Sequence, residues 1–277
     1  MNLIWEFCKS VLLGIVQGIT EWLPISSTGH MLLLNEFLQM NVSEACWNIF
    51  KVVIQLGSIL AVVVLYFHKR NPFSPRKTAA QKRDTLSLWG KVLIASVPTA
   101  VIGLLLDDIV DSYLSVPPVI AAALIVYGVL FLWMESRPHR IRVTDFGSMP
   151  YTTALLIGCF QTLAIIPGTS RSGSTILGAT LCGCSRQIAA EFSFFMAIPA
   201  MAGASGLKLV KAAANGSLAL FTGTEWLLLA VGFIVAFLVS LIVIRMLMQF
   251  IQKHDFKPFG WYRIVLGLVV LVWFFLR

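Results

Sequence analysis

Apolar segments about 20 residues long, the length that a helix needs to cross a bilayer, recur from one end of the 277-residue chain to the other. Six of these segments are continuous, and they cover residues 48–67, 91–106, 117–134, 190–210, 226–249 and 260–276. Hydrophobic residues make up 58% of the chain and charged residues only 12%, whereas soluble domains are about one quarter charged. The sequence therefore predicts an all-α integral membrane protein with a single membrane domain over residues 1–277.

Two further apolar regions, 4–38 and 153–185, are each interrupted by a polar stretch that contains proline and glycine. The second arm of each region is only about 10 residues long, which is too short to cross a bilayer as a helix. Irregular backbone at membrane depth is tolerated only where it is buried in protein or lines a water-filled cavity, because its N–H and C=O groups need partners. We therefore expect two re-entrant helical hairpins that share one cavity, in addition to six transmembrane helices.

The two interrupted regions match each other at an offset of 144 residues. Each is followed by three of the six continuous segments, and an odd number of crossings per half inserts the second half upside down. The sequence thus predicts an inverted-topology repeat of two pseudo-symmetric halves, about 1–134 and 151–277, whose hairpin tips meet near the middle of the bilayer. The matched residues are Gly14, Gln17, Ser26, Thr28 and Gly29 in the first region and Gly158, Gln161, Ser170, Ser172 and Gly173 in the second.

Charges in the connections predict which side of the membrane each connection occupies. Residues 68–91 carry seven Lys and Arg residues and one acid, whereas residues 107–116 carry three acids, Asp107, Asp108 and Asp111, and no base. Cytoplasmic loops are enriched in Lys and Arg, so we expect the first connection in the cytoplasm and both chain ends outside. The net charge of +8 has the same explanation, and a nucleic-acid partner is not expected.

The first interruption brings together a carboxylate, several hydroxyls and an imidazole. Gln17 and Glu21 are four residues apart on an apolar helix, so their side chains share one face. An isolated carboxylate is costly in hydrocarbon, and we expect Glu21 to face the cavity and a cation. The stretch then supplies hydroxyls, a nucleophile and a base, at Ser26, Ser27, Thr28 and His30.

A structural interpretation of this first stretch remains open. The hydroxyls could cap the second arm of the hairpin, and His30 could make a structural hydrogen bond. Trp22 and other tryptophans near segment ends and polar breaks are expected to anchor the protein at the membrane interface.

The second interruption, residues 165–178, is suited to a phosphate. Ser and Gly residues that precede a helix offer backbone N–H groups at its positive end, and Arg171 offers two parallel donors to phosphate oxygens. Candidate phosphate ligands are Gly168, Thr169, Ser170, Ser172, Gly173 and Thr175. Two alternatives stay open: Arg171 could pair with an acid such as Glu191, and Thr175 could be a helix cap instead of a ligand.

Together the two stretches supply a cation-binding carboxylate, a nucleophile, a base and an anion clamp, which are the parts that phosphoryl transfer requires. The chain contains neither a GxxxxGK[ST] loop nor a GxGxxG fingerprint, so nucleotide hydrolysis is not indicated. The phosphate is expected to be attached to a molecule that resides in the bilayer.

The chain resembles the undecaprenyl-diphosphate phosphatases, the bacitracin-resistance protein family of bacteria, over almost its whole length. The stretches that carry the resemblance are QGITEWLPISSTGH (17–30), FKVVIQLGSILAV (50–62), PGTSRSGST (167–175) and EFSFFMAIP (191–199). The resemblance implies hydrolysis of undecaprenyl diphosphate to undecaprenyl phosphate and inorganic phosphate, which recycles the lipid carrier for cell-wall synthesis. It also implies a divalent cation, Mg²⁺ or Ca²⁺, and a multi-pass location in the bacterial inner membrane, with the catalytic cavity open to the periplasm.

The family motifs fall on the residues already singled out. The (E/Q)xxxE element falls on Gln17 and Glu21, and the PGxSRSxxT element on residues 167–175. Many members have glutamate where this chain has Gln17, so Glu21 is the only charged metal ligand expected here, with Gln17 adding a neutral oxygen.

The family motifs also suggest a mechanism. Ser27 would attack the terminal phosphorus, and His30 would accept its proton or activate the later water, with His30 itself as nucleophile left open. Glu21 would hold the cation on the diphosphate, while Arg171 and the loop amides would neutralise the developing charge.

Secondary transporters provide the main alternative function, because they too are built from inverted repeats with interrupted helices. A transporter or flippase of a phosphorylated lipid carrier would use the same anion clamp without cleaving a bond. A transporter needs no nucleophile beside a base, so the combination of Glu21, Ser27 and His30 favours hydrolysis. The expected partners are the lipid substrate and the bilayer, with a homodimer left open.

Overall fold

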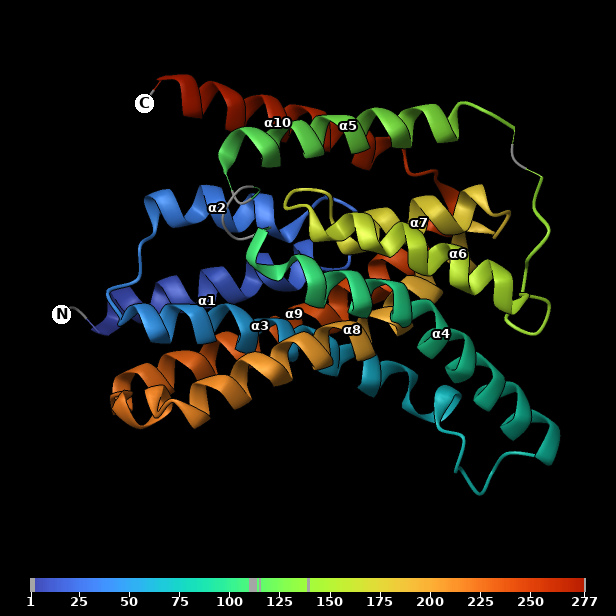
Figure 1. The fold of residues 1–277 in the computed structure, drawn as a ribbon, viewed down its shortest axis with the longest axis horizontal. Coiled ribbons are helices and arrows are strands. Elements are labelled where there is room, and N and C mark those ends of the chain that lie inside the picture. Colours follow the sequence, from blue (N-terminus) through green and yellow to red (C-terminus); the bar gives the residue numbers. More distant parts are fainter. Residues whose placement is uncertain (1–2, 110–113, 115, 139, 277) are drawn as a thin grey trace.

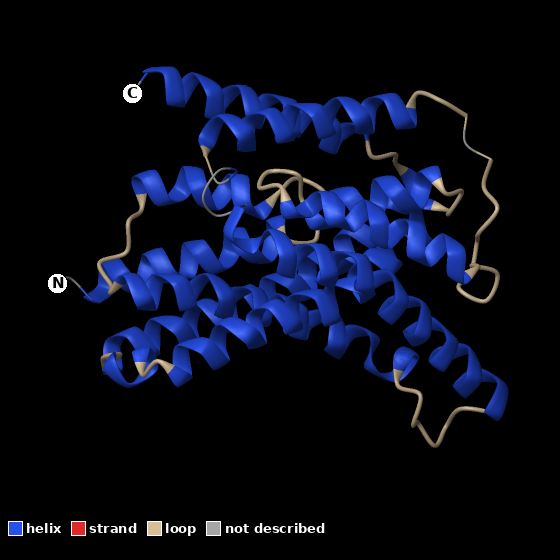
Figure 2. Cartoon of the chain, viewed as in Figure 1, coloured by secondary structure: helices blue, strands red, loops and turns tan. Residues whose placement is uncertain are grey.

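The computed structural model describes residues 3–109, 114, 116–138 and 140–276. These residues form ten α-helices and two short 3₁₀ helices, and the only β-type pairing within the described residues is a bridge between Val143 and Cys184. The prediction of an all-α protein is confirmed (Figure 2). The α-helices are α1 (Leu3–Thr20), α2 (Ser27–Phe37), α3 (Glu44–Arg70), α4 (Ala79–Ile109), α5 (Pro117–Glu135), α6 (Tyr151–Thr162), α7 (Arg171–Leu181), α8 (Arg186–Ala214), α9 (Gly223–Lys253) and α10 (Lys257–Leu276).

Seven helices in the described part of the chain are long and apolar enough to cross a membrane. Six of them, α3, α4, α5, α8, α9 and α10, contain the six predicted segments, and the seventh is α1, the first arm of the first interrupted region. Large apolar side chains cover the outside of these helices, and Leu104 and Phe275 are 74% and 77% exposed. Such a surface would aggregate in water, whereas a bilayer covers it. The chain is therefore a multi-pass membrane protein.

The helices form two groups, the pair α5 and α10 and the remaining helices below that pair (Figure 1). α5 and α10 lie side by side along the top of the view, while α1 and α3 both pack on α9, and α3 also packs on α8. α4 runs along α6. The large core cluster contains Trp22, Phe131, Phe192 and Phe194, all fully buried. Helices from both halves of the sequence thus surround the hairpin turns.

The two interrupted regions fold into the helix pairs α1–α2 and α6–α7. The first pair opens toward the left end of Figure 1 and the second toward the right end, and their turns lie near the middle. The short second arms, α2 and α7, have 11 residues each. α2 and α7 begin and end 144 residues apart, at 27 and 171 and at 37 and 181, and α4 and α9 also begin and end at this offset.

Both turns end on a serine in a left-handed backbone conformation. Ser26 has a φ of 71° and Ser170 a φ of 73°, a region that residues with a Cβ rarely adopt. Each serine side chain accepts a hydrogen bond from the backbone N–H three residues later, at 3.4 Å from Gly29 N and 3.2 Å from Gly173 N. The hydroxyls therefore cap α2 and α7, which bears out the structural interpretation for Ser26 and gives Ser170 the same role.

One predicted connection is shorter than expected. α3 continues to Arg70 and α4 begins at Ala79, so only residues 71–78 connect them instead of 68–91. Lys91 is buried in α4, where its Nζ donates to the carbonyl oxygen of Phe146 at 2.6 Å. The predicted connection was too long because it included the basic residues at the end of α3 and in the first turns of α4. The acidic connection cannot be compared in the same way, because Asp111 lies outside the described residues.

Two connections lie at the end of the molecule opposite to the start of α1 and the end of α10. Residues 71–78 and 140–150 both lie at the right end of Figure 1, whereas α1 begins and α10 ends at the left end.

A test of the fold uses the close approach of α6 to α4. A methyl group on Gly158 would overlap the backbone of Ala95, whereas one on Gly203 in α8 would meet nothing within 4 Å. We expect Gly158→Ala to destabilise the protein by about 1–3 kcal/mol through overpacking. The matched Gly203→Ala variant should be as stable as the parent or more so, because alanine favours helix. Thermal unfolding in detergent measures both, and equal melting temperatures would contradict this packing.

Candidate active site

The Glu21 carboxylate connects the two hairpins. It is buried, with 6% of the residue exposed, and each of its oxygens accepts hydrogen bonds. Within the first hairpin, Oε2 accepts from Gln17 Nε2 at 2.9 Å and from Ser27 Oγ at 3.1 Å. From the second hairpin, Arg171 Nη2 donates to Oε1 at 3.2 Å. The structure thus brings the predicted acid, nucleophile and arginine together at one carboxylate.

Backbone contacts also hold the two turns together. Ser172 is buried, and its hydroxyl lies 3.2 Å from the Glu21 carbonyl oxygen and 3.1 Å from that of Leu23. Ser172, predicted as a phosphate ligand, is therefore engaged with the first hairpin in this structure.

Arg263 on α10 is a residue of this region that sequence reasoning missed. It is fully buried, and its guanidinium donates to Pro24 O of the first turn at 3.1 Å, and to Gly168 O and Thr169 O of the second at 2.9 and 2.8 Å. The sequence did offer a signal for Arg263, because it is a charged residue inside the predicted segment 260–276. Ionisable residues at membrane depth are costly and usually functional.

Arg171 is held from its other side by α8. Its Nη1 donates to the Ser193 carbonyl oxygen at 2.7 Å, and Thr175 Oγ1 lies 2.6 Å from Ser193 Oγ. The Thr175 hydroxyl therefore supports the arginine through Ser193 in this structure. The alternative acid, Glu191, pairs instead with Lys69 and Arg70.

Trp22 is part of the site, and its predicted role as an interfacial anchor is wrong. The residue is fully buried, with its ring in edge-to-face contact with Phe194 at 5.3 Å between centroids. The Arg171 guanidinium carbon lies 5.7 Å from the centre of the Trp22 ring, so the ring faces a cation. Trp22 follows Glu21 directly, and both residues are buried at the hairpin turn.

Two buried N–H donors at the site have no acceptor, Arg171 Nε and Trp22 Nε1. A buried donor without a partner costs about 1–3 kcal/mol, and a ligand with acceptor oxygens can relieve this cost. Both donors belong to residues in contact with each other and next to Glu21. This arrangement favours an oxygen-rich anion as the ligand.

The hydrogen bonds of His30 go to residues other than Ser27. Its Nδ1 lies 2.7 Å from the Ser26 carbonyl oxygen, and its Nε2 lies 2.7 Å from the hydroxyl of Tyr262 on α10. The Ser27 hydroxyl donates to Glu21 instead. The predicted base and nucleophile are thus near neighbours in the chain with separate hydrogen-bond partners.

The remaining predicted phosphate ligands lie in the turns or in the first turn of the helix that follows. Thr28 is exposed, whereas Thr169 is buried, and Gly168 has a φ of 92° that suits glycine. Ser170 Oγ lies 3.2 Å from Ser172 Oγ and accepts from the N–H of Gly173. The backbone N–H of Gly173, in the first turn of α7, is therefore already used by the helix cap.

The Glu21 carboxylate and the Ser27 hydroxyl are oxygen ligands of the types that Mg²⁺ and Ca²⁺ prefer. The Gln17 amide presents its nitrogen to Glu21 and would have to turn over to offer its oxygen to a cation. No cluster of three His, Cys, Asp or Glu residues that could hold a metal ion occurs among the residues that the structure describes. A cation at Glu21 would therefore need most of its ligands from substrate or water.

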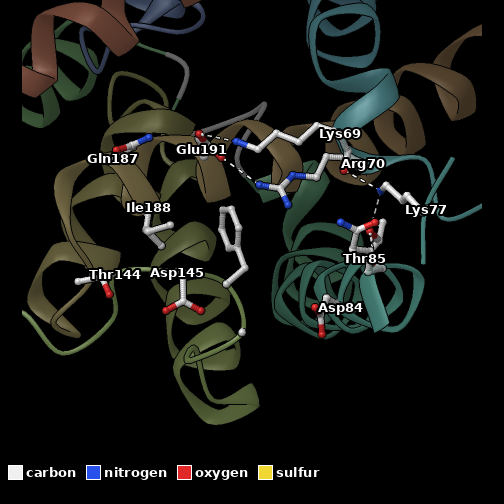
Figure 3. Close-up of a pocket in the computed structure, with 13 residues that line it drawn as sticks. Lys69, Arg70, Lys77, Asp84, Thr85, Thr144, Asp145, Gln187, Ile188 and Glu191 are labelled. Carbon is white, nitrogen blue, oxygen red and sulfur yellow. Dashed lines mark hydrogen bonds and ion pairs between the residues drawn. The ribbon is translucent and has the colours of Figure 1, made fainter. Parts of the chain in front are cut away.

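A cavity of about 660 Å³ lies elsewhere, among residues of α3, α4 and α8 and the segment 144–147 (Figure 3). Glu191 accepts from Arg70 Nη2 at 3.1 Å and from Lys69 Nζ at 3.5 Å, so its one negative charge is paired with two positive ones. The cavity shares no lining residue with the hairpin turns.

Known proteins resemble this chain over nearly its full length. The family model described as bacitracin resistance protein BacA matches residues 10–269. A Clostridioides difficile (strain 630) protein named undecaprenyl-diphosphatase 1 is 57% identical over 98% of this chain and 97% of its own length. An undecaprenyl-diphosphatase of Lactiplantibacillus plantarum is 58% identical over 97% of this chain and 98% of its own length. With this extent of similarity, the chain belongs to the bacitracin resistance protein BacA family.

Proposed function

We propose that this chain is an undecaprenyl-diphosphate phosphatase, which hydrolyses undecaprenyl diphosphate to undecaprenyl phosphate and inorganic phosphate. It would thereby recycle the lipid carrier for cell-wall synthesis and confer bacitracin resistance. The observation that carries the proposal is the position of Glu21. It accepts a hydrogen bond from Ser27 of its own hairpin and forms an ion pair with Arg171 of the other. This arrangement places a nucleophilic hydroxyl beside an anion clamp, and the names of the relatives specify the same reaction.

The contacts of Ser27 and His30 suggest how the two steps of hydrolysis divide between them. Ser27 Oγ would form a bond to the terminal phosphorus while the bridging P–O bond breaks, and undecaprenyl phosphate would leave. The hydroxyl already donates to Glu21, so a carboxylate is in place to receive its proton. His30 would then take a proton from the water that hydrolyses the phosphoserine, releasing inorganic phosphate.

Arg171 would stabilise the charge on the transferred phosphoryl group. Its Nε is buried without a partner, and Trp22 Nε1 is in the same state, so two donors are available to equatorial oxygens. Ser193 and Trp22 fix the guanidinium in advance, which lowers the cost of organising it during the reaction.

We further propose that Glu21 and Gln17 hold a divalent cation, Mg²⁺ or Ca²⁺, when substrate is present. The cation would neutralise charge on the diphosphate oxygens. The oxygen donors around Glu21 support this choice of metal, and a single carboxylate would make the site weak without substrate.

The arrangement of the halves supports an inverted repeat with two re-entrant hairpins. The two helix pairs open toward opposite ends of the molecule, and the left-handed serines Ser26 and Ser170 terminate both turns at the predicted offset. We place the protein in the bacterial inner membrane, with the basic connections in the cytoplasm and the catalytic cavity open to the periplasm.

Removing the nucleophile or the base tests the reaction. Ser27→Ala and His30→Ala should each abolish phosphate release from undecaprenyl diphosphate by the purified protein, because each removes a reacting group. His254→Ala, at an exposed position after α9, is the matched control and should retain full activity. With substrate labelled in its terminal phosphate, His30→Ala should accumulate labelled protein and Ser27→Ala should not. Full activity of Ser27→Ala would refute the serine mechanism.

The clamp is tested by Arg171→Lys. Lysine keeps the charge but has neither the planar donors nor the Nε group, so we expect kcat to fall about 100-fold. Arg245→Lys, at an exposed position on α9, should leave the rate unchanged. A normal kcat for Arg171→Lys would remove the arginine from the clamp.

Chelation tests the cation. Phosphate release should stop in excess EDTA and return with added Mg²⁺ or Ca²⁺, and Glu21→Gln should be inactive at all metal concentrations. Glu44→Gln, at the exposed start of α3, is the control. Full activity in EDTA would exclude the cation role. An absence of phosphate release from the parent protein under every condition would favour transport of the lipid carrier.

A further inference from the structure

The hydrogen bonds of His30 define which of its nitrogens carries the proton. Nδ1 lies 2.7 Å from the carbonyl oxygen of Ser26, and a carbonyl oxygen can only accept. Nδ1 is therefore protonated, and in the neutral ring Nε2 carries the lone pair. The hydroxyl of Tyr262, 2.7 Å away, is then the donor to Nε2.

Tyr262 also fixes the plane of the imidazole. The two rings are stacked, with centroids 5.6 Å apart and an angle of 6° between their planes. Tyr262 is 46% exposed, so the pair lies at an accessible edge of the protein and not in its packed core. The hydrogen bond and the stacking together restrain both the tilt and the rotation of the ring.

Arg263, the next residue in the chain, fixes the position of Tyr262 relative to the two hairpin turns. Arg263 is fully buried and donates to carbonyl oxygens of both hairpin turns, Pro24 and Gly168 among them. Among the described residues no other side chain donates to these carbonyl oxygens, and a one-residue shift of α10 would leave them and a buried guanidinium without partners. Arg263 therefore locks α10 in register with the turns and holds Tyr262 opposite His30.

We propose that Tyr262 is a positioning residue for His30, and that α10 is thereby a third part of the active site beside the two hairpins. Its hydroxyl and ring hold the imidazole with Nδ1 toward Ser26 and keep Nε2 unprotonated, and the Tyr262 O–H turns away from Nε2 when that nitrogen takes the proton of the water. The assignment of a reaction step to His30 rests on the proposed function, whereas the orientation of the ring rests on the contacts alone.

A graded pair of substitutions separates the two contacts. Tyr262→Phe keeps the stacking and loses the hydroxyl, and we expect kcat to fall about 10-fold with KM unchanged. Tyr262→Leu loses both contacts and should lower kcat by about 100-fold, again with little change in KM. Tyr151→Phe, at the start of α6, is the matched control and should keep the parent kcat. All variants should keep the parent melting temperature in detergent within error.

An NMR measurement reports the tautomer of the His30 imidazole and does not depend on activity. The chain has four histidines, and ¹⁵N-labelled imidazole signals can be assigned to His30 by the loss of one set in His30→Gln. The parent should show the Nδ1–H form of His30, and Tyr262→Leu should convert part of it to the Nε2–H form.

The two measurements distinguish the ways in which the inference can fail. An Nε2–H form of His30 in the parent would overturn the proposed orientation even if the enzyme is active. Parent-level kcat in both Tyr262 variants would overturn the positioning role. Failure of the parent to release phosphate would count against the proposed function, while the imidazole signals would still decide the orientation.

Discussion

A buried carboxylate shared between two hairpins is the interaction on which this structure depends. The side chain of Glu21 is 6% exposed and that of Arg171 13%, and each charge would be expensive alone at this depth. Removing one partner of a buried ion pair typically costs about 3–5 kcal/mol, because the remaining charge is left uncompensated. Since the partners belong to different halves of the chain, the pair also joins the two halves. In the proposed reaction the same two groups bind the cation and the diphosphate.

The turns are built from backbone conformations that the surrounding contacts must maintain. Left-handed serines at 26 and 170 are unfavourable by about 1–3 kcal/mol each, and such residues persist where the environment fixes them. Their hydroxyls cap the short helices α2 and α7. Arg263 donates to carbonyl oxygens of the turns. The site is thus held by groups on three separate parts of the chain, which favours a preorganised arrangement.

Most of the architecture could be predicted from the pattern of apolar segments. The six continuous segments became helices, and the short arms after each interruption have the expected length. Glu21, Ser27 and Arg171 were recognisable because charged and hydroxyl side chains stand out in an apolar sequence, and the structure brings them together. The tryptophan at 22 was misassigned, because composition near a break cannot distinguish an interfacial ring from one turned inward.

The sequence by itself determined the helices, the two breaks and the chemical types of the groups at the breaks, because hydrophobicity and local backbone preference act over a few residues. Only the tertiary structure decided the partners of those groups. Ser27 donates to Glu21, His30 contacts Tyr262, and Arg263 joins both turns, across separations of 6 to 239 residues. Such pairings depend on how helices distant in the chain pack against one another, and no local pattern encodes that packing.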